Sequence, residues 1–251
     1  MSNFITIGLA GRLGNQLYQH SAAIALALKN RAEYLAYPKS DTADEPNYFK
    51  GLFPEWQPSN GIEFEYTEPS HAYTPIEFRP NMRLTGYFQS HKYWWDIQDK
   101  VLPLFKINPI VKKDTVAIHW RLGDFLVLQQ KHNLITEGYI QRAVQYYNNR
   151  GFSKFLVASD NIELCKPIFQ SEYFKESTFE FSEGKTALED MALLAGCAHQ
   201  IGSASTFSYW NFYLNPNPNK TCILPDNLWG SSHQNVPQGD SHPPNCIRFK
   251  N

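Results

Sequence analysis

The stretch that most constrains this chain is Val-Ala-Ile-His-Trp-Arg-Leu-Gly-Asp-Phe, at residues 116–125. Residues 116–118 are apolar and too few for a helix, so they predict a buried strand. Ligands of an open parallel sheet bind beyond the carboxyl ends of the strands, which is where His119 and Arg121 come. Because side chains alternate along a strand, these two share one face and Trp120 takes the other.

Arg121 offers a planar fork of donors that suits a phosphate or a carboxylate. Gly123 is expected to permit the sharp exit that ends the strand. Asp124, next in the chain, is expected to orient the arginine more than to react. The alternative is that Arg121 and Asp124 form an ion pair that only braces a turn.

The amino-acid composition limits the number of domains and the kinds of ligand that the chain can bind. The chain has 251 residues, 42% apolar and 19% charged, which allows a real core in one large domain or two small ones. The net charge of −1 gives no basic field for nucleic acid or an anionic membrane, so any anion site must be local. The 15% aromatic content suits a sugar-binding surface, or simply a core rich in rings.

The cysteines contain no C-x-x-C pair, which argues against a zinc or redox motif and fits buried thiols in a reducing compartment. The first residues do not resemble a signal peptide, and no run of 18 apolar residues exists. We therefore expect a cytoplasmic protein without a transmembrane segment, which leaves peripheral membrane association open.

Strand and helix patterns alternate on both sides of residue 112, which predicts two α/β units with parallel sheets. Residues 103–112, with two prolines and a lysine pair, are interpreted as a linker. The expected domains are 1–110 and 111–251.

A glycine-rich loop follows the first expected strand, at 4–7, and precedes a helix at 17–29. Such a loop can bring its backbone against a diphosphate at a helix N-terminus, where Arg12 and Asn15 can also reach a ligand. Its spacing, G-x-x-G-x-x-G, matches neither the dinucleotide fingerprint nor a P-loop. A tight turn with close helix packing explains the glycines equally well.

The remaining expected elements follow in order. Residues 40–74 are interpreted as an irregular region on the acceptor side, and irregular structure is expected after residue 225. The expected strands are 34–37, 83–88, 155–158, 179–181, 199–202 and 222–224, and the expected helices are 96–102, 139–149, 162–169, 187–198 and 209–214.

Three loops of the second half follow strands, so a parallel sheet would bring them to one edge. They are the turn at His119 and Arg121, the pair Ser159-Asp160, and the hydroxyl-rich loop 203–207. Together they offer a cation, a carboxylate and N–H donors. These groups suit a nucleoside diphosphate, with the carboxylate matched to the adjacent N–H donors of guanine.

The motifs in order resemble those of the α-1,2-fucosyltransferases. They are Gly-Arg-Leu-Gly-Asn-Gln-Leu at 11–17, Gly-Tyr-Phe-Gln-Ser at 86–90, His-x-Arg-x-Gly-Asp at 119–124 and Ser-Thr-Phe-Ser-Tyr-Trp at 205–210. The His-x-Arg motif is shared with α-1,6- and protein O-fucosyltransferases. The resemblance implies a GT-B fold of two Rossmann-like domains with a cleft between them, GDP-β-L-fucose as donor, inversion at the sugar, and no metal or other cofactor.

Site roles follow from the resemblance. Arg121 would bind the β-phosphate and stabilise the leaving GDP, His119 would contact the ribose or phosphate side, and Asp160 would read guanine. The implied catalytic set is Arg121, His119 and Asp124. The implied donor-binding set is Gly11, Arg12, Gly14, Asn15, His119, Arg121, Ser159, Asp160, Ser205, Thr206 and Phe207. One departure is Leu122, where the family often has a second arginine.

The expected activity is therefore transfer of L-fucose from GDP-fucose to a glycan hydroxyl, forming an α-1,2 linkage to galactose. The general base stays open among Asp124, Glu137 and Glu65, and a dissociative step needs no strong base. Two rival readings also stay open, namely another GDP-sugar as donor, or a non-catalytic sugar-binding module with the same fold.

Overall fold

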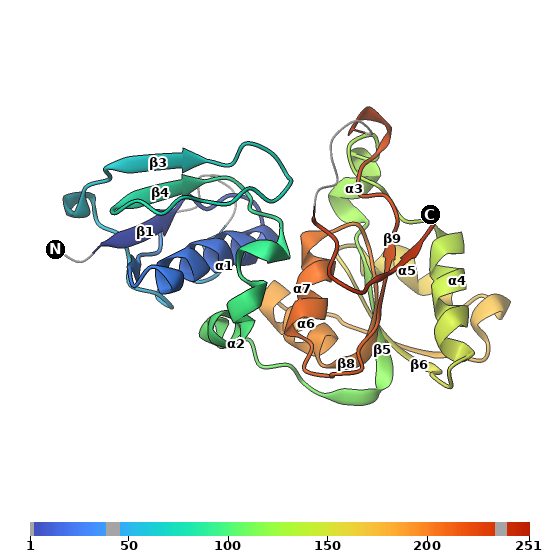
Figure 1. The fold of residues 1–251 in the computed structure, drawn as a ribbon. Helices are drawn as coiled ribbons and strands as arrows, with labels where there is room; N and C mark the ends of the chain where they lie inside the picture. Colours follow the sequence, from blue (N-terminus) through green and yellow to red (C-terminus); the bar gives the residue numbers. More distant parts are fainter. Residues whose placement is uncertain (1–2, 39–45, 234–239) are drawn as a thin grey trace. The chain divides into compact units, whose positions relative to one another are not determined.

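The structure is a computed structural model of the chain, and it describes residues 3–38, 46–233 and 240–251. The chain divides into two compact units, Met1–Lys106 with Gly239–Ser241, and Ile107–Gln238 with His242–Asn251. Each unit contains a parallel sheet with helices (Figure 1). The predicted α/β class is thereby confirmed.

The first unit is built on a sheet of order β2-β1-β4-β3, in which every neighbouring pair is parallel. The buried strand β1 lies inside this sheet, and α1 packs against it. The elements are β1 (Phe4–Ile7), α1 (Leu13–Lys29), β2 (Glu33–Tyr34), β3 (Phe64–Thr67), β4 (Met82–Thr85) and α2 (Gln98–Val101), with 3₁₀ turns at Pro58–Asn60, His91–Tyr93, Trp95–Ile97 and Leu102–Phe105.

Several expectations for the first unit were wrong in detail. The region 40–74 is not wholly irregular, because β3 lies within it and pairs with β4 along its length. Glu65 is therefore a strand residue, not a loop residue. The second strand stops at Tyr34, and only an isolated bridge between Ala36 and Glu55 continues it. The part of the prediction at residues 40–45 lies outside the described residues.

The second unit holds a parallel sheet of order β10-β9-β8-β5-β6-β7. The strands are β5 (Lys112–Trp120), β6 (Lys154–Ser159), β7 (Thr178–Phe181), β8 (Cys197–Gly202), β9 (Cys222–Pro225) and β10 (Ile247–Phe249). The helices are α3 (Gly123–Val127), α4 (Glu137–Asn148), α5 (Ile162–Phe169), α6 (Ala187–Ala195) and α7 (Thr206–Leu214), with 3₁₀ turns at Glu172–Phe174 and Ser231–His233.

Strand β5 is buried from both sides, as its run of apolar residues predicted. Val116, Ile118 and Trp120 belong to one core cluster with α4 and α5, whereas Ala117 packs with Leu194 of α6 on the other face. Helices therefore cover both faces of the sheet around β5 (Figure 1). The alternation along β5 also confirms that Trp120 and His119 point to opposite faces.

Elements of the second unit also differ from the predicted ones. Helix α6 stops before Gly196, where a Cβ would overlap the carbonyl of Ile110, and β8 begins at once. The expected irregular end of the chain contains β10, which pairs in parallel with β9. Its residues Ile247 and Phe249 pack on the core cluster of the α4 side, which explains why a short segment forms a strand.

Cys165, Cys197 and Cys222 are buried free thiols, as the sequence predicted, and Cys246 is partly exposed. None of the helices within the described ranges is long and apolar enough to cross a bilayer.

The hydroxyl of Tyr139 ties α4 to the sheet, because it lies 2.9 Å from the carbonyl oxygen of Gly202 and 3.1 Å from that of Ile223. We expect Tyr139→Phe to lower the free energy of unfolding by about 1 kcal/mol, since a buried hydrogen bond is lost. Urea denaturation measures this change. Tyr173→Phe, at an exposed ring of the same unit, should leave stability unchanged, and equal values for the two variants would contradict the assignment.

Candidate functional site

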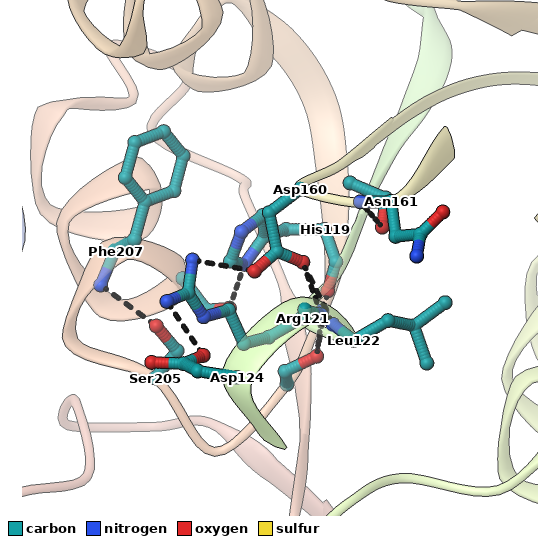
Figure 2. Close-up of polar contacts among 12 residues, drawn as sticks. His119, Arg121, Leu122, Asp124, Asp160, Asn161, Ser205 and Phe207 are labelled. Carbon is teal, nitrogen blue, oxygen red and sulfur yellow. Dashed lines mark hydrogen bonds and ion pairs between the residues drawn. The ribbon is translucent and has the colours of Figure 1, made fainter. Parts of the chain in front are cut away.

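Arg121 follows the last residue of β5, and its guanidinium lies between two carboxylates. Nη1 is 2.8 Å from Oδ2 of Asp160, and Nη2 is 2.7 Å from Oδ1 of Asp124 (Figure 2). The arginine side chain is only 14% exposed. The sequence analysis gave the ion pair with Asp124 as an alternative. The ion pair with Asp160 connects Arg121 to the residue that follows β6.

Asp160 reaches Arg121 because β5 and β6 are paired in register. Trp120 lies opposite Ser159, so the next residues, Arg121 and Asp160, leave the sheet side by side. The second oxygen of Asp160, Oδ1, accepts hydrogen bonds from the backbone N–H groups of Leu122, at 2.8 Å, and Gly123, at 2.9 Å. Both oxygens of this carboxylate are therefore engaged.

Gly123 is a glycine for a different reason from the predicted one. Its φ does not lie in the left-handed region, so no sharp exit requires it. A Cβ at this position would instead overlap the carboxylate of Asp160. The missing side chain lets the Asp160 carboxylate approach the backbone after β5.

His119 is buried at the end of β5 on the α7 side. Its ring centroid lies 4.7 Å from that of Phe207, and Nδ1 is 2.7 Å from Oγ of Ser208. Burial, with the nearby charge of Arg121, lowers the pKa of His119 to about 3. His119 is therefore neutral near pH 7, and can offer hydrogen bonds but no positive charge.

Ser203 connects the two residues of the His-x-Arg motif. Its Oγ donates to the carbonyl oxygen of His119 at 3.0 Å and accepts from the backbone N–H of Arg121 at 2.8 Å, while its own N–H donates to the same carbonyl at 3.1 Å. The pairing of His119 with Gly202 brings Ser203 to this position. The sequence flagged the loop 203–207 but not the roles of Ser203 and Ser208.

The other predicted residues of the second unit lie at the same strand ends. Ser205 precedes α7 and caps it, accepting from the N–H of Phe207 at 3.3 Å, so the helix begins at Thr206 and not at 209. Ser159 accepts from the N–H of Asn161 at 3.1 Å. The first turn of α7 carries no acidic residue, which keeps its N-terminus favourable to an anion.

The glycine-loop residues belong to the first unit and meet the motif at 86–90 there. Gly11 has a φ of 73°, and a Cβ on it would overlap Asn15. Gln89 donates to Oδ1 of Asn15 at 3.0 Å, and Gln19 bridges the N–H of Ala10 and the carbonyl oxygen of Gly86. Arg12 is the N-cap residue of α1, and Gly14 lies inside that helix, which begins at Leu13 rather than 17.

Leu122 and Glu137 are two further residues that the sequence analysis singled out. Leu122 is 6% exposed and belongs to the apolar core cluster, so the position of the family's second arginine is a core position here. Glu137 begins α4 and accepts from the side chain of Gln141 at 3.0 Å. Across the described residues, no group of three or more His, Cys, Asp or Glu side chains is arranged to hold a metal ion.

The sequence model of glycosyl transferase family 11 matches residues 61–241. The chain belongs to this family. Galactoside 2-alpha-L-fucosyltransferase SEC1 of Bos taurus is 26% identical over 242 residues, covering 83% of this chain and 64% of the relative. The alpha-1,2-colitosyltransferase of Escherichia coli is 28% identical over 150 residues, covering 53% of this chain and 51% of the relative. The family 11 chain thus spans two thirds or less of these relatives' lengths.

Solved structures support the fold of this family 11 protein. The crystal structure of POFUT1 in complex with GDP-fucose superposes with a TM-score of 0.53 at 14% identity, covering 88% of this chain and 97% of that one. The fucosyltransferase NodZ from Bradyrhizobium gives a TM-score of 0.52 at 14% identity, covering 86% and 94%. At this identity the likeness establishes the fold alone.

The neutral state of buried His119 should make stability pH-dependent. The pKa of His119 is lowered from 6.5 to about 3 in the folded protein. The stability that this neutral side chain contributes is therefore complete above pH 6.5 and is lost as the pH falls toward 3. Between about pH 7 and 5.5 this one group should cost about 1 kcal/mol. We expect His119→Gln to flatten the decline of the unfolding free energy by that amount, and parallel curves would contradict a buried neutral histidine.

The close approach of Asp160 to Gly123 can also be tested. Gly123→Ala should displace the carboxylate from the two N–H groups, lowering the free energy of unfolding by about 1–3 kcal/mol. Gly138→Ala is the matched control, because the Cβ there meets nothing closer than 3.5 Å and lies in α4, where alanine favours the helix. In thermal denaturation, Gly138→Ala should be at least as stable as the wild type. A Gly123→Ala variant as stable as the wild type would contradict the close approach of Asp160.

Proposed function

We propose that this family 11 protein transfers L-fucose from GDP-β-L-fucose to a hydroxyl of a glycan acceptor, with inversion and formation of an α-1,2 linkage to galactose. The observation that carries the proposal is the oriented guanidinium of Arg121 at the carboxyl end of β5. The relatives named for galactoside α-1,2-fucosyl transfer support the choice of sugar and linkage.

Arg121 would act on the leaving group. As the bond between the sugar and the diphosphate lengthens, negative charge grows on the β-phosphate. A guanidinium stabilises this charge more in the transition state than in the ground state, which is the condition for acceleration. The two carboxylates use one N–H direction on each terminal nitrogen, and an arginine carries five N–H donors, so the guanidinium can still bind phosphate.

The residues around Arg121 divide into ligand-binding and positioning groups. We assign the start of α7, with Ser205, Thr206 and Phe207, to the diphosphate, since its N–H groups and the absence of an acid favour an anion. Neutral His119 would contact the ribose or phosphate side. Asp160 would read guanine, as the resemblance implies, and it also takes a positioning role, because its two oxygens hold Arg121 and two backbone N–H groups.

Two further parts of the proposal rest on the family resemblance. Gly11, Arg12, Gly14 and Asn15 would contribute to donor binding. No metal or other cofactor would be needed, since Arg121 and N–H groups would carry the charge of the leaving diphosphate. Asp124, Glu137 and Glu65 are the candidates for the general base.

One alternative donor has a specific observation behind it. The Escherichia coli relative is named for transfer of colitose, not fucose, and Leu122 here replaces an arginine that the fucosyltransferases often carry. A different GDP-sugar is therefore the second candidate. Hydrolysis assays with GDP-fucose and GDP-mannose in parallel separate the donors, and binding of GDP without hydrolysis or transfer would instead indicate a non-catalytic module.

Arg121→Ala should reduce turnover of GDP-fucose by about a hundredfold or more, as expected when a group that stabilises transition-state charge is removed. Arg121→Lys should recover little, because lysine lacks the planar fork. Initial rates of GDP release measure both. Arg150→Ala, on an exposed arginine that stacks on Tyr146, is the control and should retain full activity. Near wild-type rates for either Arg121 variant would refute the proposal.

A further inference from the structure

The imidazole of His119 is held by a hydroxyl group from α7. Nδ1 lies 2.7 Å from Oγ of Ser208, and the two residues are only 7% and 2% exposed. We propose that Ser208 is a positioning residue that fixes the ring orientation of His119, with Nδ1 toward α7. The proposal deepens the function proposed above and rests on it for the role of His119 in donor binding.

Gly202 provides the space that this contact needs. It pairs with His119 across β8 and β5, and a Cβ built on it would lie 2.7 Å from Cβ of Ser208 and 3.0 Å from its Oγ. Any larger residue at 202 would push the first turn of α7 away from the ring. The glycine at the end of β8 therefore permits the Ser208 hydroxyl to reach Nδ1.

Other contacts restrain His119 without distinguishing its two nitrogens. Ser203 fixes the backbone carbonyl, and the ring of Phe207 covers the imidazole at an interplanar angle of 33°. A ring turned over by half a rotation would satisfy both contacts equally well. Among the contacts of the described residues, the hydrogen bond to Ser208 separates the two orientations, because the turned ring would place a C–H group against Oγ.

The same hydrogen bond decides which ring nitrogen can meet a ligand. A neutral imidazole has one N–H donor and one acceptor nitrogen, and a serine hydroxyl can pair with either kind. With Nδ1 bonded to Ser208, Nε2 is the nitrogen left to meet a ligand. Ser208 would thus ensure that His119 presents Nε2, and not a ring C–H group, to the nucleotide, without itself contacting the nucleotide.

The test compares Ser208→Ala with the wild type in two measurements. Nitrogen-15 NMR of the His119 ring, assigned with His119→Gln, should show a different Nδ1 shift in Ser208→Ala from that in the wild type, because the hydrogen bond to Oγ is lost. Titration calorimetry should show GDP binding weakened by about two- to tenfold, as expected for one lost hydrogen bond. Ser21→Ala, which removes another fully buried helical hydroxyl, should change neither quantity.

The outcomes separate positioning from general structural support. Unchanged His119 shifts in a folded Ser208→Ala protein would overturn the proposal, even if GDP binding weakened. If Ser208→Ala does not fold, Ser208→Cys replaces it, and its weaker hydrogen bond should give intermediate shifts. Absence of GDP binding by the wild type would instead contradict the proposed function, while the ring shifts would still decide the role of Ser208.

Discussion

The ion pair between Arg121 and Asp160 is the interaction on which the candidate site depends. It exists because β5 and β6 are parallel and in register up to Trp120 and Ser159, so that the next residue of each strand leaves the sheet beside the other. The carboxylate also receives two backbone N–H groups, which fixes it independently of the arginine. Strand register, and not loop flexibility, therefore sets the direction of the guanidinium.

The charges of the site explain why this support is needed. A guanidinium that is 14% exposed has lost much of its hydration, and two carboxylates with good geometry compensate for that loss. His119 lies close to the same charge but stays neutral, because burial and Arg121 both lower its pKa. The site thus concentrates its positive charge on one side chain, and the serines of the loop after β8 orient the groups around it.

Much of this arrangement could be predicted from the sequence because it depends on local patterns. The apolar run at 116–118 and the alternation of His119 and Trp120 specify a buried strand with two different faces. The sequence does not predict β10, because this strand is short and forms through pairing with β9. The sequence predicts a loop at Glu65 for the same reason, since β3 depends on its pairing with β4.

The polar partners of the site could be predicted only in part. Asp124 is three residues from Arg121, so their pair was foreseen from the chain itself. The contacts of Ser203 and Ser208 depend on how β8 pairs with β5, which no short motif encodes. Gly123 shows the same limit, because the carboxylate that excludes a side chain there comes from a residue far along the chain.

The most direct test of the account is a crystal structure of the protein with GDP bound. The account predicts that the guanidinium of Arg121, still paired with Asp160, lies within hydrogen-bond distance of the β-phosphate. GDP bound away from the carboxyl ends of β5 and β6, or a β-phosphate out of reach of Arg121, would contradict it.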